Sequence, residues 1–209
     1  MSVPVGGGTP ATLVSGLSYP LAIAVDGASV YWTDTDDGTV MKVPIGGGPA
    51  ITLAAGQTDA QFIAVDSTSV YWTIGNTGGA VTKMPLDGGT PTILATGGFP
   101  WSIAVDATHV YWSDFVGHTL MSVPLGGGTP TTLSTMDGLP VGLTVNGASL
   151  YWAALNTSVM KVPLGGGVAT TLASGQSPNG GVAVNATSVY WTSFGDNSND
   201  GGVMRLPLE

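Results

Sequence analysis

The chain repeats one short phrase at a nearly fixed interval. A Tyr-Trp pair preceded by Val or Leu occurs five times, and the intervals between its tyrosines are 40, 40, 40 and 39 residues: Tyr31, Tyr71, Tyr111, Tyr151 and Tyr190. One unit of this size cannot bury its own apolar surface and has to stack on its neighbours. Residues 1–209 are therefore expected to form a single domain of five repeats.

Each unit has the pattern of four short β-strands. In the first unit, the segments 21–26, 30–33, 39–44 and 50–54 are the predicted strands, and turns rich in Gly, Asp and Ser separate them. Helical periodicity is absent from the chain. Four antiparallel strands in about 40 residues match one blade of a β-propeller. The predicted fold is an all-β, five-bladed β-propeller of four-stranded antiparallel blades.

Three segments of the first unit carry a family resemblance. Residues 23–26 read IAVD, residues 31–34 read YWTD and residues 40–43 read VMKV. This series resembles the YWTD blade of low-density-lipoprotein-receptor class B propellers, and also bacterial tandem-repeat and engineered symmetric propellers of the same pattern. The resemblance covers nearly the whole chain, and it implies a propeller fold and an extracellular or periplasmic location. The chain departs from the receptor pattern, because the Thr-Asp end recurs only as Ser113-Asp114 and because receptor propellers usually have six blades.

The two ends of the chain suggest how the ring closes. Residues 9–14 form only a fourth strand, and residues 203–207 form a third strand that no fourth strand follows. We expect residues 9–14 to complete the last blade, because closure removes exposed sheet edges. Residues 1–4 duplicate the end of a third strand and would compete with residues 204–207 for one site. A monomer is expected, and an oligomer of shared blades is the alternative.

The charge of the chain excludes two classes of partner. The formal net charge is −9, and the chain has only four basic residues: Lys42, Lys83, Lys161 and Arg205. Nucleic acids and anionic membranes both require a clustered basic surface, so neither is an expected partner. A cationic ligand or a metal ion suits this charge better.

Comparing the five units with one another separates constant positions from variable ones. The Tyr-Trp pairs are interpreted as core between blades, although an aromatic ligand cage is the rival reading. The residue before the first turn of each unit is interpreted as a turn former, and paired catalytic carboxylates are the alternative. These residues are Asp26, Asp66, Asp106, Asn146 and Asn185.

The variable positions belong to two sets of loops that share one rim of a propeller. They are the loops between the second and third strands and the links between units, near residues 15–20, 34–38, 55–61, 74–80, 96–101, 114–118, 135–142, 154–158, 174–181 and 193–202. We call this side the variable rim. Binding residues gather on loops held by a rigid scaffold, although neutral drift also makes loops vary.

The aromatic residues outside the repeat lie on or beside the variable rim. Four of them are the predicted contacts for a carbohydrate, peptide or protein: Tyr19, Trp101, Phe115 and Phe194. Phe62 and Phe99 also break the repeat there. An exposed tryptophan near a propeller channel can serve as a binding platform, and plugging the channel mouth is the structural alternative.

One loop has part of a calcium-binding pattern. Asp196, Ser198 and Asp200 place oxygen atoms at alternate positions, and Gly201 follows them. Such ligands suit Ca²⁺, although Pro207 stands where an acidic residue would complete the pattern. Calcium is the only cofactor that the sequence suggests, and an ordinary water-exposed turn is the alternative.

Catalysis has little support in the sequence. The chain has no cysteine, and His109 and His118 are predicted to lie on opposite rims. We therefore expect no enzyme but a scaffold or binding module. Two alternatives stay open: an engineered or recently amplified repeat scaffold without an evolved ligand, and a metal-assisted hydrolase or lyase on the acidic rim. Carboxylates from separate loops, such as Asp59 and Asp137, could form such a site.

Overall fold

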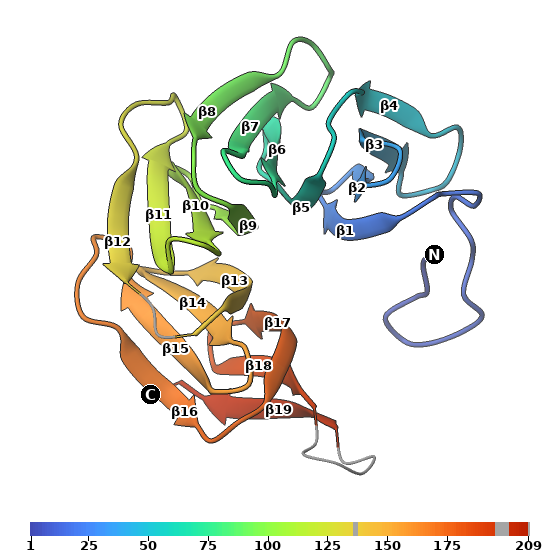
Figure 1. The fold of residues 1–209 in the computed structure, drawn as a ribbon. Helices are drawn as coiled ribbons and strands as arrows, with labels where there is room; N and C mark the ends of the chain where they lie inside the picture. The colour runs from blue at the N-terminus through green and yellow to red at the C-terminus, as the bar shows by residue number, and fades with distance from the viewer. Residues whose placement is uncertain (136–137, 195–200, 209) are drawn as a thin grey trace.

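The computed structural model describes residues 1–135, 138–194 and 201–208, and every regular element in these residues is a β-strand. Five antiparallel sheets follow one another along the chain and stand side by side around a common axis, as in a five-bladed β-propeller (Figure 1). The predicted fold class is thereby confirmed. Within the described segments, no helix has the length and apolar character needed to cross a membrane.

The first two sheets consist of β1 (Pro20–Val25), β2 (Ser29–Asp34), β3 (Thr39–Pro44) and β4 (Ile51–Ala54), then β5 (Ala60–Val65), β6 (Ser69–Ile74), β7 (Ala80–Pro85) and β8 (Thr92–Thr96). The next two consist of β9 (Pro100–Val105), β10 (His109–Asp114), β11 (Thr119–Pro124) and β12 (Thr131–Thr135), then β13 (Pro140–Asn146), β14 (Ser149–Ala154), β15 (Ser158–Pro163) and β16 (Thr170–Ser174). The fifth consists of β17 (Pro178–Val184), β18 (Ser188–Ser193) and β19 (Gly202–Pro207). The strands predicted for the first unit agree with β1–β4 to within one residue at each end.

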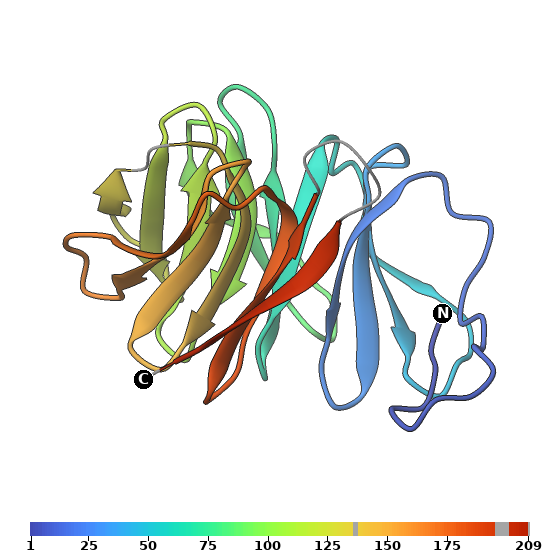
Figure 2. The same ribbon diagram turned by 90° about the horizontal axis from the view of Figure 1, so that it is seen from below.

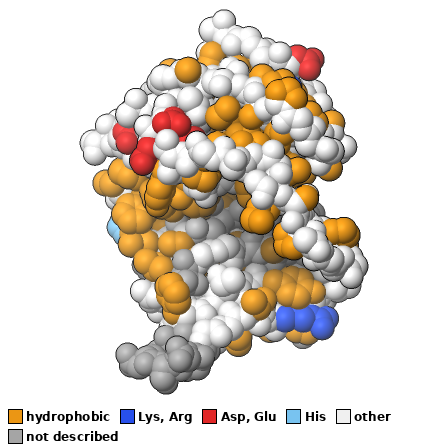
Figure 3. Space-filling model, turned by 90° about the vertical axis from the view of Figure 1, so that its right-hand side faces the viewer, with side chains coloured by type: hydrophobic (Ala, Val, Ile, Leu, Met, Phe, Trp, Pro, Cys, Tyr) orange, Lys and Arg blue, Asp and Glu red, His pale blue; other side chains and the backbone are white. Residues whose placement is uncertain are grey.

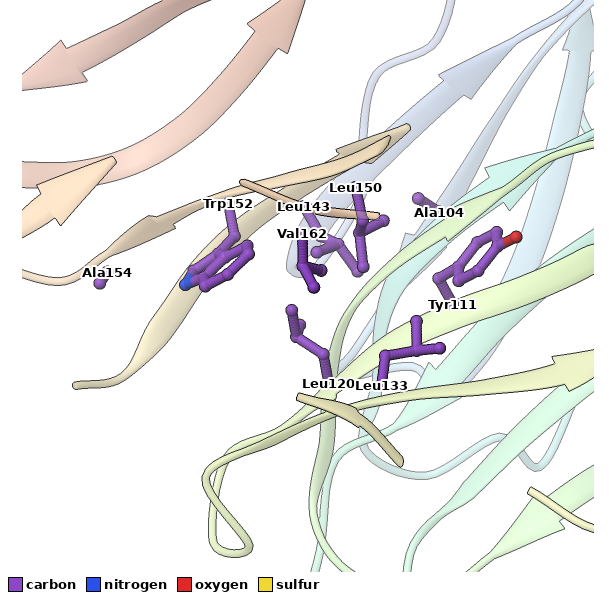
Figure 4. Packing of buried hydrophobic residues seen from close by; sticks show 9 residues of the cluster. All are labelled: Ala104, Tyr111, Leu120, Leu133, Leu143, Leu150, Trp152, Ala154 and Val162. Atoms are coloured by element: carbon purple, nitrogen blue, oxygen red, sulfur yellow. The ribbon is translucent and has the colours of Figure 1, made fainter. Parts of the chain in front are cut away.

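Four tyrosines and four tryptophans of the Tyr-Trp pairs form the core between blades, as predicted, whereas Trp32 and Tyr190 lie on the end faces of the first and last sheets. Successive side chains of a strand point to opposite faces, so the tyrosine of one blade and the tryptophan of the next meet in one apolar layer. Tyr31 shares such a layer with Trp72, and Tyr71 shares the next with Trp112. Figure 4 shows the third layer, in which Tyr111, Leu120 and Leu133 of the third sheet face four side chains of the fourth: Leu143, Leu150, Trp152 and Val162.

The acidic residue before the first turn of each of the first three units is a turn former, as predicted. Asp66 accepts hydrogen bonds from the backbone N–H groups of Thr68 (2.7 Å) and Ser69 (2.8 Å) and from the hydroxyl of Tyr71 (2.7 Å). Asp26 and Asp106 make the same set of bonds. The carboxylate thus ties the turn to the middle strand, and we call this arrangement the Asp–Tyr lock.

The lock changes along the chain. In the fourth unit Asn146 does not form the predicted turn bonds among the described residues, and its side-chain amide donates instead to the carbonyl of Asn185 at 3.0 Å. In the fifth unit Asn185 keeps the two turn bonds, to Thr187 and Ser188, through its carbonyl oxygen. Its amide nitrogen reaches the hydroxyl of Tyr190 only at 3.4 Å. A neutral amide at that distance is a weaker partner for a phenol than a carboxylate at 2.7–2.8 Å.

The predicted ring closure by residues 9–14 is wrong in this structure. The fifth sheet has three described strands in the order β17-β18-β19, and residues 9–14 lie beside the first sheet instead (Figures 1 and 2). Ser2 and Ala11 exchange two backbone hydrogen bonds, of 2.8 and 2.7 Å. Their pairing repeats the register of Lys42 with Ile51.

Competition from residues 1–4, which duplicate the end of a third strand, accounts for this difference. Residues 1–4 occupy the position on residues 9–14 that residues 204–207 of β19 would need for closure. A hairpin between neighbouring segments forms at a lower entropic cost than pairing between the two ends of the chain. We call residues 1–14 the N-terminal arm.

Candidate functional site

Four aromatic rings of the variable rim form one contiguous group, the aromatic cluster: Phe62, Phe99, Trp101 and Phe115. The ring of Trp101 lies at the centre. Its centroid is 5.4 Å from that of Phe62, 6.1 Å from that of Phe99 and 5.8 Å from that of Phe115. Phe99 and Phe115 complete the group at 5.7 Å. The tilted rings lie within the range at which aromatic pairs attract each other.

The cluster draws its members from two adjacent blades. Phe62 lies on β5 and Trp101 on β9, while Phe99 immediately precedes β9 and Phe115 immediately follows β10. The backbone N–H of Phe115 donates to the carbonyl of Phe99 at 2.9 Å. The hydroxyl of Thr73 donates to the carbonyl of Trp101 at 2.7 Å and so joins the two blades.

Asp114 fixes the loops that carry two of the rings. Its carboxylate accepts hydrogen bonds from the backbone N–H groups of Phe99 (3.1 Å), Val116 (3.1 Å) and Gly117 (2.9 Å). Charge-assisted bonds of this kind are the stronger ones in proteins. Asp114 is therefore a positioning residue for the aromatic cluster.

The rings of the cluster are accessible from solvent. All four of its residues are half-buried, whereas the five tryptophans of the repeat are at most 5% exposed. Because the rings are held in place yet partly uncovered, they can contact a ligand with little loss of side-chain entropy.

A cavity of about 360 Å³ adjoins the cluster. It lies between the inner strands β5, β9, β13 and β17, and both Phe62 and Trp101 line it. Gly142 and Gly180 approach closely on its far side, where a Cβ at Gly142 would meet the carbonyl oxygen of Gly180 at 2.7 Å. The part of the lining that β13 and β17 supply combines three glycines with Val141, Leu143 and Val182.

Two other acidic residues of the variable rim, Asp34 and Asp59, hold loops. Buried Asp34 accepts hydrogen bonds from the N–H groups of Ser18 (3.1 Å) and Tyr19 (2.9 Å). Asp59 accepts one from the side-chain amide of Asn76 at 3.0 Å. Within residues 1–135, 138–194 and 201–208, no group of three or more His, Cys, Asp or Glu side chains is placed to share a metal ion.

The histidines lie at opposite ends of one hairpin. His109 begins β10 and pairs with Pro124, the last residue of β11. His118 immediately precedes β11 at the opposite end of the hairpin, where Asp114 pairs with Thr119. This placement agrees with the prediction that they lie on opposite rims.

The structure brings together only part of the predicted contact set. Trp101 and Phe115 are neighbours, whereas Tyr19 and Phe194 are 53% and 62% exposed and belong to none of the described aromatic pairs. Phe62 and Phe99 join the cluster although the sequence did not single them out as contacts. The sequence feature that could have identified them as contacts is that both aromatic residues break the repeat on the same rim. Asp196, Ser198 and Asp200, like Asp137, fall outside the described residues.

Comparisons with known proteins place the chain by fold. No protein-family model and no curated protein sequence matches it. A chain in the crystal structure of a nidogen/laminin complex is similar at 22% identity and a TM-score of 0.76, over 90% of this chain and 76% of that one. Virginiamycin B lyase from Staphylococcus aureus is similar at 12% identity and a TM-score of 0.69, over 90% and 69%. The computationally designed Ika8 protein is similar at 15% identity and a TM-score of 0.67, over 89% and 57%.

Proposed function

We propose that this chain is a non-enzymatic binding module whose contact surface is the aromatic cluster. The observation that carries the proposal is the packing of three partly exposed phenylalanines around Trp101, beside a cavity of about 360 Å³. Partly buried aromatic anchors that border a concave surface are typical of binding sites. A propeller chain from a nidogen/laminin complex is among the similar structures, which is consistent with a protein partner.

The ligand that fits best is a peptide segment of a partner protein. The surface around the rings is largely apolar, and the carboxylate of Asp114 is already engaged by backbone N–H groups. The cluster therefore offers apolar rings, and no free carboxylate at Asp114, to a ligand. A net charge of −9 favours a segment that carries Lys or Arg beside its apolar anchor. Such a cation can also lie over the face of an aromatic ring.

Binding to a peptide array and a glycan array tests this proposal. We expect the chain to bind peptides that combine an aromatic or aliphatic residue with Lys or Arg. Trp101→Ala should weaken that binding at least about tenfold, as loss of a central anchor does. Tyr19→Ala is the matched control, because it removes an exposed ring of the same rim outside the cluster.

Four results would contradict the proposal. Binding to glycans alone would change the ligand class, and equal losses from Trp101→Ala and Tyr19→Ala would move the site away from the cluster. A hydrolase or lyase activity that a chelator abolishes would favour the metal-assisted alternative. The absence of any binding on both arrays would favour a repeat scaffold without an evolved ligand.

A further inference from the structure

The first sheet has an outer face that no other described sheet covers. We call it the first-blade face, and Ile23, Val25 and Trp32 belong to it. Ile23 is 69% exposed, whereas the equivalent Ile63, Ile103 and Leu143 of the next three sheets are 6–8% exposed. Those three side chains are buried because each packs against the sheet before it.

The fifth sheet has the opposite face uncovered. We call it the last-blade face, and it carries Tyr190, Thr192, Val203 and Arg205. Val203 is 77% exposed, whereas its equivalents in the first four sheets are all 0% exposed: Val40, Val81, Leu120 and Val159. The equivalents of Thr192 are fully buried as well: Thr33, Thr73, Ser113 and Ala153.

These two faces correspond to the two halves of the interface between neighbouring blades. The chain forms this interface four times internally, each time by placing the Tyr31-type face of one sheet on the Trp72-type face of the next. Figure 3 views the side of the molecule on which the end sheets lie, and hydrophobic side chains surround a hollow there. The indole N–H of Trp32 is buried without a hydrogen-bond partner, and its side chain lines a cavity of about 330 Å³ on the first-blade face.

Polar groups on the two faces also match. Between blades, the hydroxyls of Thr33 and Thr73 donate to the carbonyls of Gln61 (2.6 Å) and Trp101 (2.7 Å). The equivalent pair across an end-to-end contact is Thr192 with the carbonyl of Leu21.

Basic side chains also donate hydrogen bonds to a backbone carbonyl of the next blade. Lys42 donates to the carbonyl of Leu86 at 2.6 Å, and Lys83 donates to that of Leu125 at 3.0 Å. Arg205 occupies the equivalent position on the last-blade face, and the carbonyl of Ile45 is the equivalent acceptor on the first blade.

We propose that the last-blade face binds the first-blade face of a second copy of this chain. The contact is head to tail, so each copy uses a different surface. The N-terminal arm of the second copy is already near the required place, because Leu13 and Val14 line the cavity beside Trp32. Residues 9–14 of that arm can pair with the free edge of β19 once residues 1–4 leave it. Assembly thus adds a fourth strand to the three described strands of the last blade.

Native mass spectrometry from about 1 µM to about 1 mM, the range in which weak to moderate interfaces associate, tests this inference. We expect masses at multiples of 20.9 kDa. Val203→Asp and Ile23→Asp should each weaken association at least about 100-fold, because each buries an unpaired carboxylate in the contact. Both side chains are exposed in the single chain, so neither change should affect its folding. Val168→Asp is the matched control, since Val168 is 89% exposed outside both faces.

Mixing the two variants distinguishes a head-to-tail contact from a symmetric one. The Val203→Asp chain keeps an intact first-blade face, and the Ile23→Asp chain keeps an intact last-blade face. The mixture should therefore form a one-to-one complex and nothing larger, although neither variant associates alone. A wild-type mass of 20.9 kDa at every concentration, or association that survives both changes, would overturn the proposal.

Discussion

Replacing Asp66 tests whether the Asp–Tyr lock stabilises a blade as its geometry implies. Asp→Ala removes the acceptor of the turn N–H groups and of the Tyr71 hydroxyl, and leaves that hydroxyl and the N–H of Ser69 without a protein partner. We expect a loss of about 3 kcal/mol in the free energy of unfolding. Asp→Asn retains a carbonyl oxygen for the turn and weakens only the bond to the phenol. Its expected cost is about 1 kcal/mol, at the low end because the site is partly solvated.

Urea unfolding followed by tryptophan fluorescence measures both values. With a denaturant slope of about 2 kcal/mol/M, the midpoint should fall by about 1.5 M for Asp66→Ala and about 0.5 M for Asp66→Asn. The chain contains the amide version at Asn185, where the turn bonds persist. Equal losses for the two variants would refute the reasoning, because they would show that the turn bonds contribute nothing beyond the bond to tyrosine.

The pH dependence provides an independent check. Burial raises the pKa of the Asp66 carboxyl, but hydrogen bonds from Thr68, Tyr71 and Ser69 together lower it below its ordinary value of 3.8. A carboxyl whose pKa is lower in the folded state stabilises the fold above the unfolded pKa and loses this contribution as the pH falls through the folded pKa. The gap in stability between wild type and Asp66→Asn should therefore be constant near neutrality and shrink below about pH 4.

Three further measurements address other parts of the molecule. Trp101→Phe should remove the fraction of tryptophan fluorescence that acrylamide quenches, because the other five tryptophans are at most 5% exposed; an unchanged fraction would place the accessible indole elsewhere. Gly142→Ala should lower the free energy of unfolding by about 2 kcal/mol, because the added Cβ would meet backbone atoms of residues 180–182, whereas Gly27→Ala, with nothing within 4 Å, should be close to neutral. Ser2→Pro should raise the affinity between copies, because it removes the N–H that binds the Ala11 carbonyl at 2.8 Å; weaker association would contradict the role of the arm as a competitor, and native mass spectrometry measures the change.

Much of the fold follows from the sequence because every blade repeats the same constraints. Alternation along segments such as 30–33 fixes which side chains face the next blade, and the Asp before the first turn of each of the first three units fixes where a strand ends. These signals are local and occur several times in the chain. Strand bounds and the core between blades were therefore predictable.

Ring closure was not predictable in the same way, because it depends on a choice between two equivalent segments. Residues 1–4 and residues 204–207 carry the same strand pattern, and only their competition for residues 9–14 decides the pairing. The aromatic cluster was predictable in part. Breaks in the repeat identified the rim and Trp101, but the grouping with Phe62 depends on how two blades are set side by side, a spacing that no single repeat encodes.

The Asp–Tyr lock uses a carboxylate in the first three units and a side-chain amide in the fifth. The C-terminal end of this array of similar blades is therefore expected to be less stable than the N-terminal end. In repeat architectures, each unit depends on its own interactions and on its neighbours. The fifth sheet has the weaker bond of Asn185 to Tyr190, one covered face and an unpaired edge at β19 among the described strands. We therefore expect opening to start at this end, so that amide protons of β18 and β19 exchange with solvent well before those of β6 and β7. The molecule would then unravel one blade at a time toward its N-terminal half.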